Sequence, residues 1–235
     1  MKYAVLNCLA GALAIAIGAV GGFLQNPWQF LMCWPGLNFL LLGIAHAAHA
    51  PGIFGKRRDG SLPWWSWVLF FPLYLLAHLC WQLLRLLSRE PPWAQVNESL
   101  LVGRRLLAGE LPRPDLTVLD LTAEFAEPAG IVRSSDYHCF PVLDAAAPGA
   151  ASLRECLLAL PPDDKPLYIH CAQGHGRTGM AAAAWLVLHG FAPDAERALK
   201  QLKSVRPGIG LQRTQRRLVD EVLAPEAAKP AARGG

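Results

Sequence analysis

The chain has 235 residues, of which 53% are hydrophobic and 17% are charged, and its formal net charge is +4. The positive excess lies entirely in residues 1–88, which carry five basic side chains and one acidic one, whereas the other 147 residues hold 17 of each sign. Because residues 89–235, which hold most of the charged side chains, carry no net charge, no nucleic-acid partner is expected. The six cysteines form no close pair or tetrad with the spacing of a metal site.

Three apolar stretches fill the first ninety residues. Residues 3–24 carry no charge and are long enough to cross a bilayer as a helix, although a signal peptide is the competing interpretation. Residues 28–50 form a second stretch, which Pro35-Gly36 is expected to interrupt, and residues 64–87 form a third with tryptophans near both ends. We therefore expect residues 1–90 to be an all-α transmembrane region of two to three helices.

A face of small residues on the first stretch favours close helix packing. Ala14, Gly18 and Gly22 recur at intervals of four, which places them on one side of a helix. A stretch that is simply rich in alanine and glycine, without a packing role for these positions, explains the same pattern equally well.

The orientation of this region depends on how many stretches cross the membrane. The loop Lys56-Arg57-Arg58 should stay in the cytoplasm by the positive-inside rule. Three full spans would then put the rest of the chain on the opposite face, unless one stretch lies in the interface or re-enters. We expect an integral protein of the cell (inner) membrane whose C-terminal domain faces the cytoplasm.

Strands and helices alternate beyond Glu90-Pro91-Pro92, which predicts an α/β domain over residues 91–223 with a central sheet flanked by helices. Short apolar runs predict strands over residues 100–103, 118–121, 137–143 and 166–169. Helices are predicted over residues 152–160, 180–189, 194–205 and 212–223. Ser152 and Glu155 have the spacing of a capping box, and Gly190 ends the second helix. The tail, residues 224–235, is expected to be disordered.

Ten residues between the last strand and its helix carry the chemistry: His170-Cys171-Ala172-Gln173-Gly174-His175-Gly176-Arg177-Thr178-Gly179. A helix that follows a glycine-bearing loop presents backbone N–H groups and the positive end of its dipole to one point. These donors favour a thiolate at Cys171, and the planar guanidinium of Arg177 suits two phosphate oxygens at once. Gly174 and Gly176 are expected to allow the tight turn. The Thr178 hydroxyl is placed to bond the sulfur as it leaves.

This loop resembles the His-Cys-x5-Arg-Ser/Thr signature of the protein tyrosine phosphatase superfamily, and most closely its dual-specificity branch, which commonly reads Gly-x-Gly-Arg-Thr-Gly. A Walker loop is excluded because no lysine precedes Thr178, and a rhodanese-like loop does not usually end in Arg-Thr-Gly. The resemblance covers residues 93–223 and implies a cysteine-phosphatase-type sheet. It also implies a phosphomonoester phosphatase that works through a phosphocysteine on phosphotyrosine, phosphoserine or phosphothreonine proteins, with no cofactor or metal.

Roles for further residues follow from the resemblance. Ala172, Gln173, Gly174, His175, Gly176 and Arg177 would form the phosphate loop, and His170 would brace Cys171 by a hydrogen bond to the loop backbone. Asp144 lies on a loop similar to the general-acid loop that often reads Asp-x-x-x-Pro, although a turn-forming aspartate would explain it too. Asp136 is the substitute acid, and Asp120 is expected to be structural. A water-orienting glutamine, Gln212 or Gln215, matches only loosely, so surface glutamines are expected.

Three alternatives stay open. A zinc site would use His138, Cys139, His170, Cys171 and His175. A lipid phosphatase would act on a head group such as phosphatidylglycerophosphate, although Ala172, Gln173 and His175 stand where inositol-lipid phosphatases often carry lysines. A membrane scaffold with a non-catalytic phosphate-binding domain is the alternative of another class.

Overall fold

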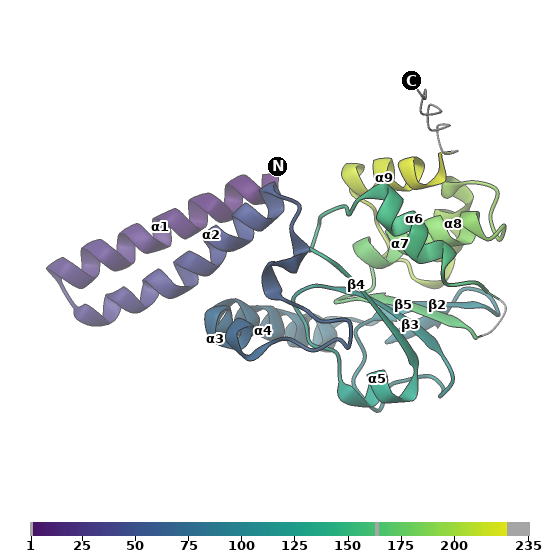
Figure 1. Ribbon diagram of the computed structural model, residues 1–235, viewed down its shortest axis with the longest axis horizontal. Coiled ribbons are helices and arrows are strands. Elements are labelled where there is room, and N and C mark those ends of the chain that lie inside the picture. The colour runs from purple at the N-terminus through teal and green to yellow at the C-terminus, as the bar shows by residue number, and fades with distance from the viewer. Residues whose placement is uncertain (1, 163–164, 225–235) are drawn as a thin grey trace, which may run out of the picture.

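The computed structural model describes residues 2–162 and 165–224 (Figure 1). Its centre is a five-stranded sheet in the order β1-β2-β5-β3-β4. The strands are β1 Trp93–Gln95, β2 Leu100–Arg104, β3 Thr117–Thr122, β4 Asp136–Val142 and β5 Leu167–Cys171. The β1–β2 pair is antiparallel and the other pairs are parallel. The predicted α/β fold and its four predicted strands are confirmed, and β1 was not predicted.

Helices cover both faces of the sheet. One face carries α6 Ala150–Leu158, α7 Gly176–Leu188, α8 Ala195–Val205 and α9 Arg213–Leu223 (Figure 1). The other face carries the short helix α5 Ala129–Ser134. Side chains of β5 alternate between the two cores, since Ile169 packs with α7 while Tyr168 packs with Ile131 of α5. The same alternation points Cys171 to the α7 side and His170 to the opposite side.

Helix starts were the weakest sequence predictions. Helix α6 begins at Ala150, and its N-cap residue is Gly149, so no side chain caps the helix. The predicted capping box with Ser152 as N-cap is therefore wrong. Helix α7 begins at Gly176, four residues before the predicted start, so the signature loop runs directly into it. The predicted end at Gly190 is confirmed by a positive φ of 76°, which glycine adopts without strain.

Helices α1 Lys2–Leu24 and α2 Cys33–Ala47 form an antiparallel hairpin that projects from the domain (Figure 1). Their backbones pack closely at glycines: a Cβ atom on Gly11 would lie 2.6 Å from the Gly36 carbonyl oxygen, and one on Gly18 would lie 2.9 Å from that of Gln29. The small-residue face is therefore a packing face, with buried Gly11, Gly18 and Gly22, whereas Ala14 is only partly buried.

The predicted interruption at Pro35-Gly36 is wrong. Pro35 lies in the first turn of α2, where its missing N–H breaks no intrahelical bond. The interruption comes earlier, where the 3-10 helix η1 Pro27–Met32 meets α2. Lys2–Leu24 and Pro27–Ala47 are the two described helices long and apolar enough to cross a membrane.

The third apolar stretch is two helices, α3 Trp64–Leu69 and α4 Phe71–Leu87, broken at Phe70. The side chain of buried Asn38, on α2, fills the break: its amide nitrogen donates to the Leu69 carbonyl oxygen (2.9 Å), and its oxygen accepts from the Leu73 N–H (3.3 Å). Apolar surroundings require such pairing, because water is absent there. The third stretch therefore forms two shorter helices, and the number of stretches that cross a membrane stays a prediction.

Helix α4 packs on the α/β domain instead. Its Trp81 donates an indole hydrogen bond to the carbonyl oxygen of Ala172, inside the signature loop (3.1 Å), and Arg85 pairs with Glu110. Phe54, from the 3-10 helix η2 Pro51–Phe54, packs in one cluster with Tyr74 and with Leu143. Side chains from before residue 90 therefore contribute to the surroundings of the loop, while the boundary at residue 90 stays a prediction.

Candidate active site

The signature loop joins the end of β5 to the start of α7. Buried Cys171 is the last residue of β5, and its sulfur accepts a hydrogen bond from the Gly174 N–H (3.3 Å). Gly174 has φ 74°, and a Cβ atom there would lie 2.3 Å from the Gly103 carbonyl oxygen, so only glycine fits. Gly176 does not have the predicted turn role, since it is the first residue of α7 and its φ is not positive.

Arg177 is buried at the first turn of α7 and held by acceptors from three segments. Its two terminal nitrogens form a bidentate pair with the Glu124 carboxylate (3.0 and 2.7 Å), and one also donates to the Val142 carbonyl oxygen (2.9 Å). Burial lowers the pKa of Arg177, but the negative charges of Glu124 and then Asp144 raise it by more. The pKa therefore ends above its ordinary value, and the guanidinium stays charged. Its Nε is buried and has no hydrogen-bond partner among the described residues.

Glu124 is a site residue that was not predicted from the sequence. It follows β3, which lies beside β5 in the sheet, so its carboxylate reaches the same edge as the loop. Burial raises the pKa of Glu124, and the charge of Arg177 more than offsets that, so the pKa ends below its ordinary value. An ionised Glu124 therefore fixes the plane of the guanidinium.

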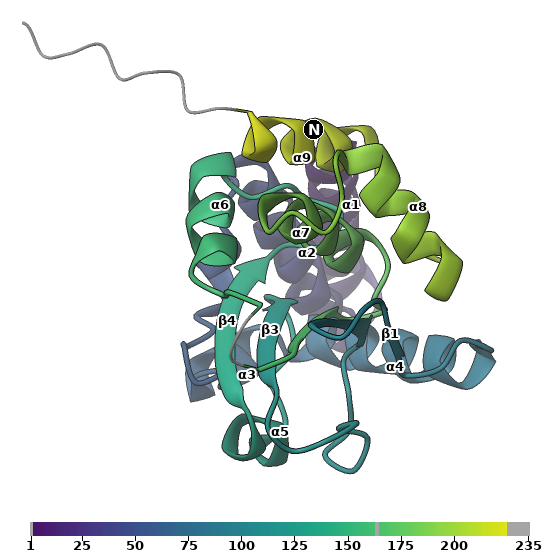
Figure 2. The same ribbon diagram turned by 90° about the vertical axis from the view of Figure 1, so that its right-hand side faces the viewer.

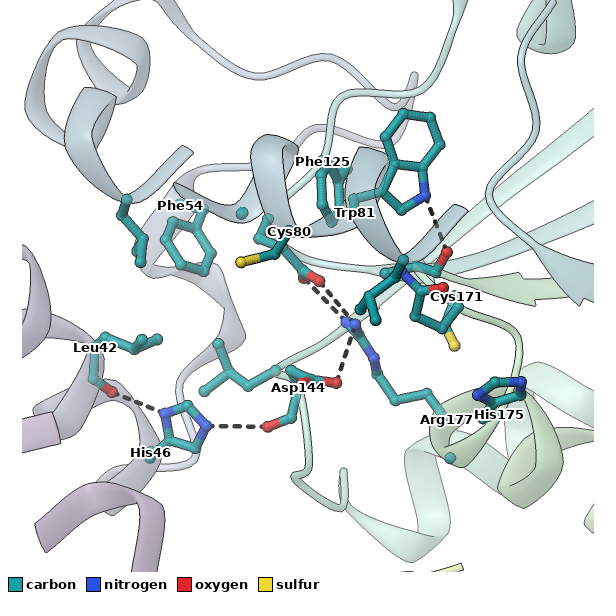
Figure 3. A pocket seen from close by; sticks show the side chains of 18 residues that line it. Leu42, His46, Phe54, Cys80, Trp81, Phe125, Asp144, Cys171, His175 and Arg177 are labelled. Atoms are coloured by element: carbon teal, nitrogen blue, oxygen red, sulfur yellow. Dashed lines mark hydrogen bonds and ion pairs between the residues drawn. The ribbon is translucent and has the colours of Figure 1, made fainter. Parts of the chain in front are cut away.

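Asp144 lies beyond the end of β4 at the mouth of the site, with its side chain 82% exposed. One carboxylate oxygen is 3.2 Å from a terminal nitrogen of Arg177, and the Asp144 carbonyl oxygen is 3.1 Å from Nε2 of His46 (Figure 3). The substitute acid, Asp136, begins β4 and pairs with His138 (3.3 Å) at the opposite end of that strand. Of the two aspartates, the structure brings Asp144 to the loop.

Other predicted loop residues make unpredicted contacts. The Thr178 hydroxyl is 3.5 Å from the Gly103 carbonyl oxygen, so its role toward the sulfur stays a prediction. Nε2 of His175 pairs with Glu90 (2.7 Å). His170 is buried and its ring stacks on Tyr168 with centroids 5.5 Å apart, and its predicted hydrogen bond to the loop backbone stays a prediction.

Gln215 corrects the expectation of two surface glutamines. It is 1% exposed, and a Cβ atom on Gly176 would lie 3.3 Å from its amide. Its side-chain oxygen accepts from the Gln212 N–H (3.1 Å) in a capping box that starts α9, whereas Gln212 bonds the Tyr3 hydroxyl (3.0 Å). Gln215 therefore packs against the phosphate loop, and any role in orienting water stays a prediction.

Arg206 and Glu90, which lie outside the signature loop, also support it. Buried Arg206, which directly follows α8, donates to the carbonyl oxygens of Gln173 and Gly174, each 3.0 Å away. Glu90, expected to mark a boundary, accepts from the Gly208 N–H (2.7 Å) as well as pairing with His175 and Arg206. The Arg206 bonds engage the carbonyl oxygens of Gln173 and Gly174, while the Gly174 N–H faces the Cys171 sulfur.

A buried charge cluster lies on the other face of the sheet. Asp120 and His170 are register partners on β3 and β5, and Glu127 lies 3.8 Å from His170. Lys56 enters from the N-terminal region, with its side chain fully buried, and its ammonium contacts Asp120 (2.5 Å) and two oxygens of Thr122 (2.8 Å each). Burial raises the pKa of Asp120, but Lys56 and then His170 lower it well below its usual range.

Asp120, Glu127 and His170 are also the one group of three metal-ligating side chains found within residues 2–162 and 165–224, with ligand atoms inside 4.8 Å. The zinc set considered from the sequence is therefore not assembled in these ranges. Burial lowers the pKa of His170 to about 4, despite the opposing effect of Asp120. The cation that meets Asp120 is the Lys56 ammonium, so this cluster is a structural ion pair, as expected for Asp120.

The loop opens into a cavity of about 350 Å³ (Figure 3). One end is polar and is formed by Cys171, Arg177, Asp144, His175 and Glu124. The other end is apolar and is formed by α2, η2 and α4, including Leu42, Phe54, Leu73, Cys80, Trp81 and Leu84. The cavity thus combines an anion-binding cup with an apolar wall that comes from the N-terminal region.

A buried cysteine in a backbone cup, a charged guanidinium and a carboxylate at one cavity define a cysteine-dependent phosphatase domain. Residues 116–228 match the family model described as PTP-SAK, Swiss Army Knife protein, DSP-PTPase phosphatase domain. Helices α1–α4 and strands β1 and β2 precede the matched residues.

Several solved structures are similar to this part of the chain, and Tk-PTP shares its fold. Tk-PTP in its active form is 24% identical over 56% of this chain and 96% of its own, with a TM-score of 0.51. Human DUSP28 is 21% identical over 56% and 93%, with a TM-score of 0.46. PTPMT1 in complex with PI(5)P is 17% identical over 56% and 94%, with a TM-score of 0.47. No curated protein matches the chain.

Proposed function

We propose that the protein is a membrane-anchored phosphatase that hydrolyses phosphomonoesters through a phosphocysteine on Cys171. The observation that carries this is the convergence of Cys171, Arg177 and Asp144 on one cavity at the start of α7. The two substrate classes named from the sequence, phosphorylated proteins and phospholipid head groups, both present the dianion that such a cup fits.

In the proposed mechanism the sulfur of Cys171 attacks phosphorus while the alcohol oxygen leaves. Arg177 and the loop N–H groups hold the three remaining oxygens, so most of the rate enhancement is electrostatic. The free Nε of Arg177 supports this role, because its terminal nitrogens are already engaged by Glu124. Asp144 donates a proton to the leaving oxygen and then takes one from the water that releases phosphate.

Membrane anchoring by the α1–α2 hairpin is part of the proposal. Two helices of 23 and 21 residues match the thickness of a bilayer core, and both ends of the hairpin contact the domain: Tyr3 reaches Gln212, and His46 reaches Asp144. The far turn, residues 25–32, carries no charge, whereas Lys2, Arg57 and Arg58 lie at the domain end. By the positive-inside rule the domain faces the cytoplasm.

A trapped intermediate tests the proposal directly. The full-length protein in detergent is mixed with p-nitrophenyl phosphate, quenched in acid, digested and analysed by mass spectrometry. We expect one phosphoryl group on the peptide that contains Cys171, together with steady release of p-nitrophenol. Absence of turnover, or phosphate on a different residue, would contradict the proposed function.

Replacing Asp144 by asparagine tests the acid role. We expect kcat to fall by about 100-fold on an alkyl phosphate, whose leaving oxygen needs a proton, and by less than about fivefold on p-nitrophenyl phosphate, which leaves as a stable anion. The matched control is Asp136→Asn, at the far end of β4, which should change neither rate. Equal slowing of both substrates by Asp144→Asn would remove Asp144 from proton transfer.

A further inference from the structure

Helix α4 carries one continuous apolar band that begins on its exposed side and ends inside the active-site cavity. Leu73, Ala77, Cys80 and Leu84 line the cavity, at intervals of three and four residues. Leu75, Leu79 and Leu86 are exposed on the outer side. At 3.6 residues per turn, the exposed side chains of Leu76, Leu83 and Leu87 fall between these two sets and join them. An apolar chain therefore meets no polar side chain of α4 along this route.

The orientation of α4 puts this band where lipid would be. The α1–α2 hairpin runs across the view in Figure 1 and is seen nearly end-on in Figure 2, whereas α4 is foreshortened in Figure 1 and runs across Figure 2. Helix α4 thus lies across the direction of the hairpin. Its junction with α3 is bonded to Asn38, inside the second apolar helix, so α4 starts alongside that helix.

The opposite wall of the cavity comes from the same hairpin. Leu42 and His46 of α2 face the cavity, and Phe54 closes it between α2 and α4. The polar end holds the guanidinium of Arg177 next to Cys171. A ligand that fills both ends has a phosphate at its tip and a hydrocarbon part directly behind it.

We propose that the cavity wall formed by α4 and α2 is an acyl-chain subsite, and that the substrate is a lipid phosphomonoester that enters sideways from the bilayer along α4. This inference rests on the proposed phosphatase function and names its substrate class. The wall residues precede the part of the chain that matches the phosphatase family, so the subsite is supplied by the membrane region. In this arrangement Leu84 and Ala77 determine specificity without touching the reacting atoms.

The test compares three substrates on the full-length protein in phosphatidylcholine vesicles: p-nitrophenyl phosphate, dioleoyl phosphatidate and a phosphotyrosine peptide. We expect Leu84→Gln, and Ala77→Phe as a variant that fills the cavity, to lower kcat/KM on phosphatidate by about tenfold. Both variants should keep activity on p-nitrophenyl phosphate within about twofold. The matched control is Leu158→Gln on α6, since Leu158 is 48% exposed and Leu84 is 49% exposed.

Each outcome has one meaning. Selective loss on phosphatidate supports the acyl-chain subsite. Unchanged phosphatidate turnover in both variants, or a wild-type preference for the peptide over phosphatidate, overturns it while the phosphatase function stands. A wild-type protein inactive on p-nitrophenyl phosphate contradicts the phosphatase function itself.

Discussion

Replacing Cys171 by serine is expected to lower the hydrolysis of p-nitrophenyl phosphate by at least about 1,000-fold. The site stabilises an anion at the sulfur, through the Gly174 N–H and the start of α7, whereas a serine hydroxyl there stays protonated at neutral pH and is a much weaker nucleophile. The cup itself is unchanged in the variant, so phosphate analogues should still bind. Initial rates and the affinity for vanadate, measured on the same preparation, check both parts.

Cys156→Ser is the matched control, because Cys156 is a partly buried free cysteine on α6, away from the cavity. It should retain full activity. A Cys171→Ser variant that keeps more than about a tenth of the wild-type rate would show that another group attacks phosphorus.

Replacing Lys56 by methionine is expected to destabilise the protein by about 3–5 kcal/mol, since it leaves the carboxylate of Asp120 buried without its cation. The side chains of both residues are fully buried, so water cannot compensate. The unpaired Asp120 also lies beside His170, which immediately precedes Cys171, so activity should fall with stability. Thermal unfolding in detergent, followed by circular dichroism, measures the loss.

A double-mutant cycle separates the ion pair from lost packing. Lys56→Met combined with Asp120→Asn should be more stable than Lys56→Met alone, because the uncompensated charge is removed. Arg58→Met, an exposed neighbour in the same loop, should leave the melting temperature unchanged. If Lys56→Met also leaves it unchanged, the buried pair does not stabilise the fold.

The parts of the site that the sequence predicts are local. Cys171, Gly174 and Arg177 lie within seven residues, and their spacing alone defines a strand, a cup and a helix start. Glu124 and Arg206 could not be predicted, because their roles depend on β3 lying beside β5 and on the loop after α8 returning beneath the cup. Sheet order is set by packing over the whole domain rather than by neighbouring residues.

The structure of the N-terminal third also could not be predicted fully from local sequence. The composition of residues 64–87 is that of a membrane helix, and nothing local distinguishes a helix that crosses lipid from one that covers an apolar cavity. The distinction depends on Trp81 meeting Ala172 and on Asn38 filling the break at Phe70, which are both contacts between distant segments. The role of Lys56 could not be predicted either, since a lysine in a loop between apolar stretches is usually interpreted as a signal of membrane topology rather than as the partner of a buried carboxylate.

The separation between Lys56 and its carboxylate bears on how the protein is made. The two partners are 64 positions apart in the sequence, so on the ribosome Lys56 is synthesised well before Asp120. The Lys56 ammonium is therefore without its carboxylate until β3 has been synthesised. A catalytic fragment translated without the preceding segment would therefore have to fold around a buried carboxylate with no counter-charge.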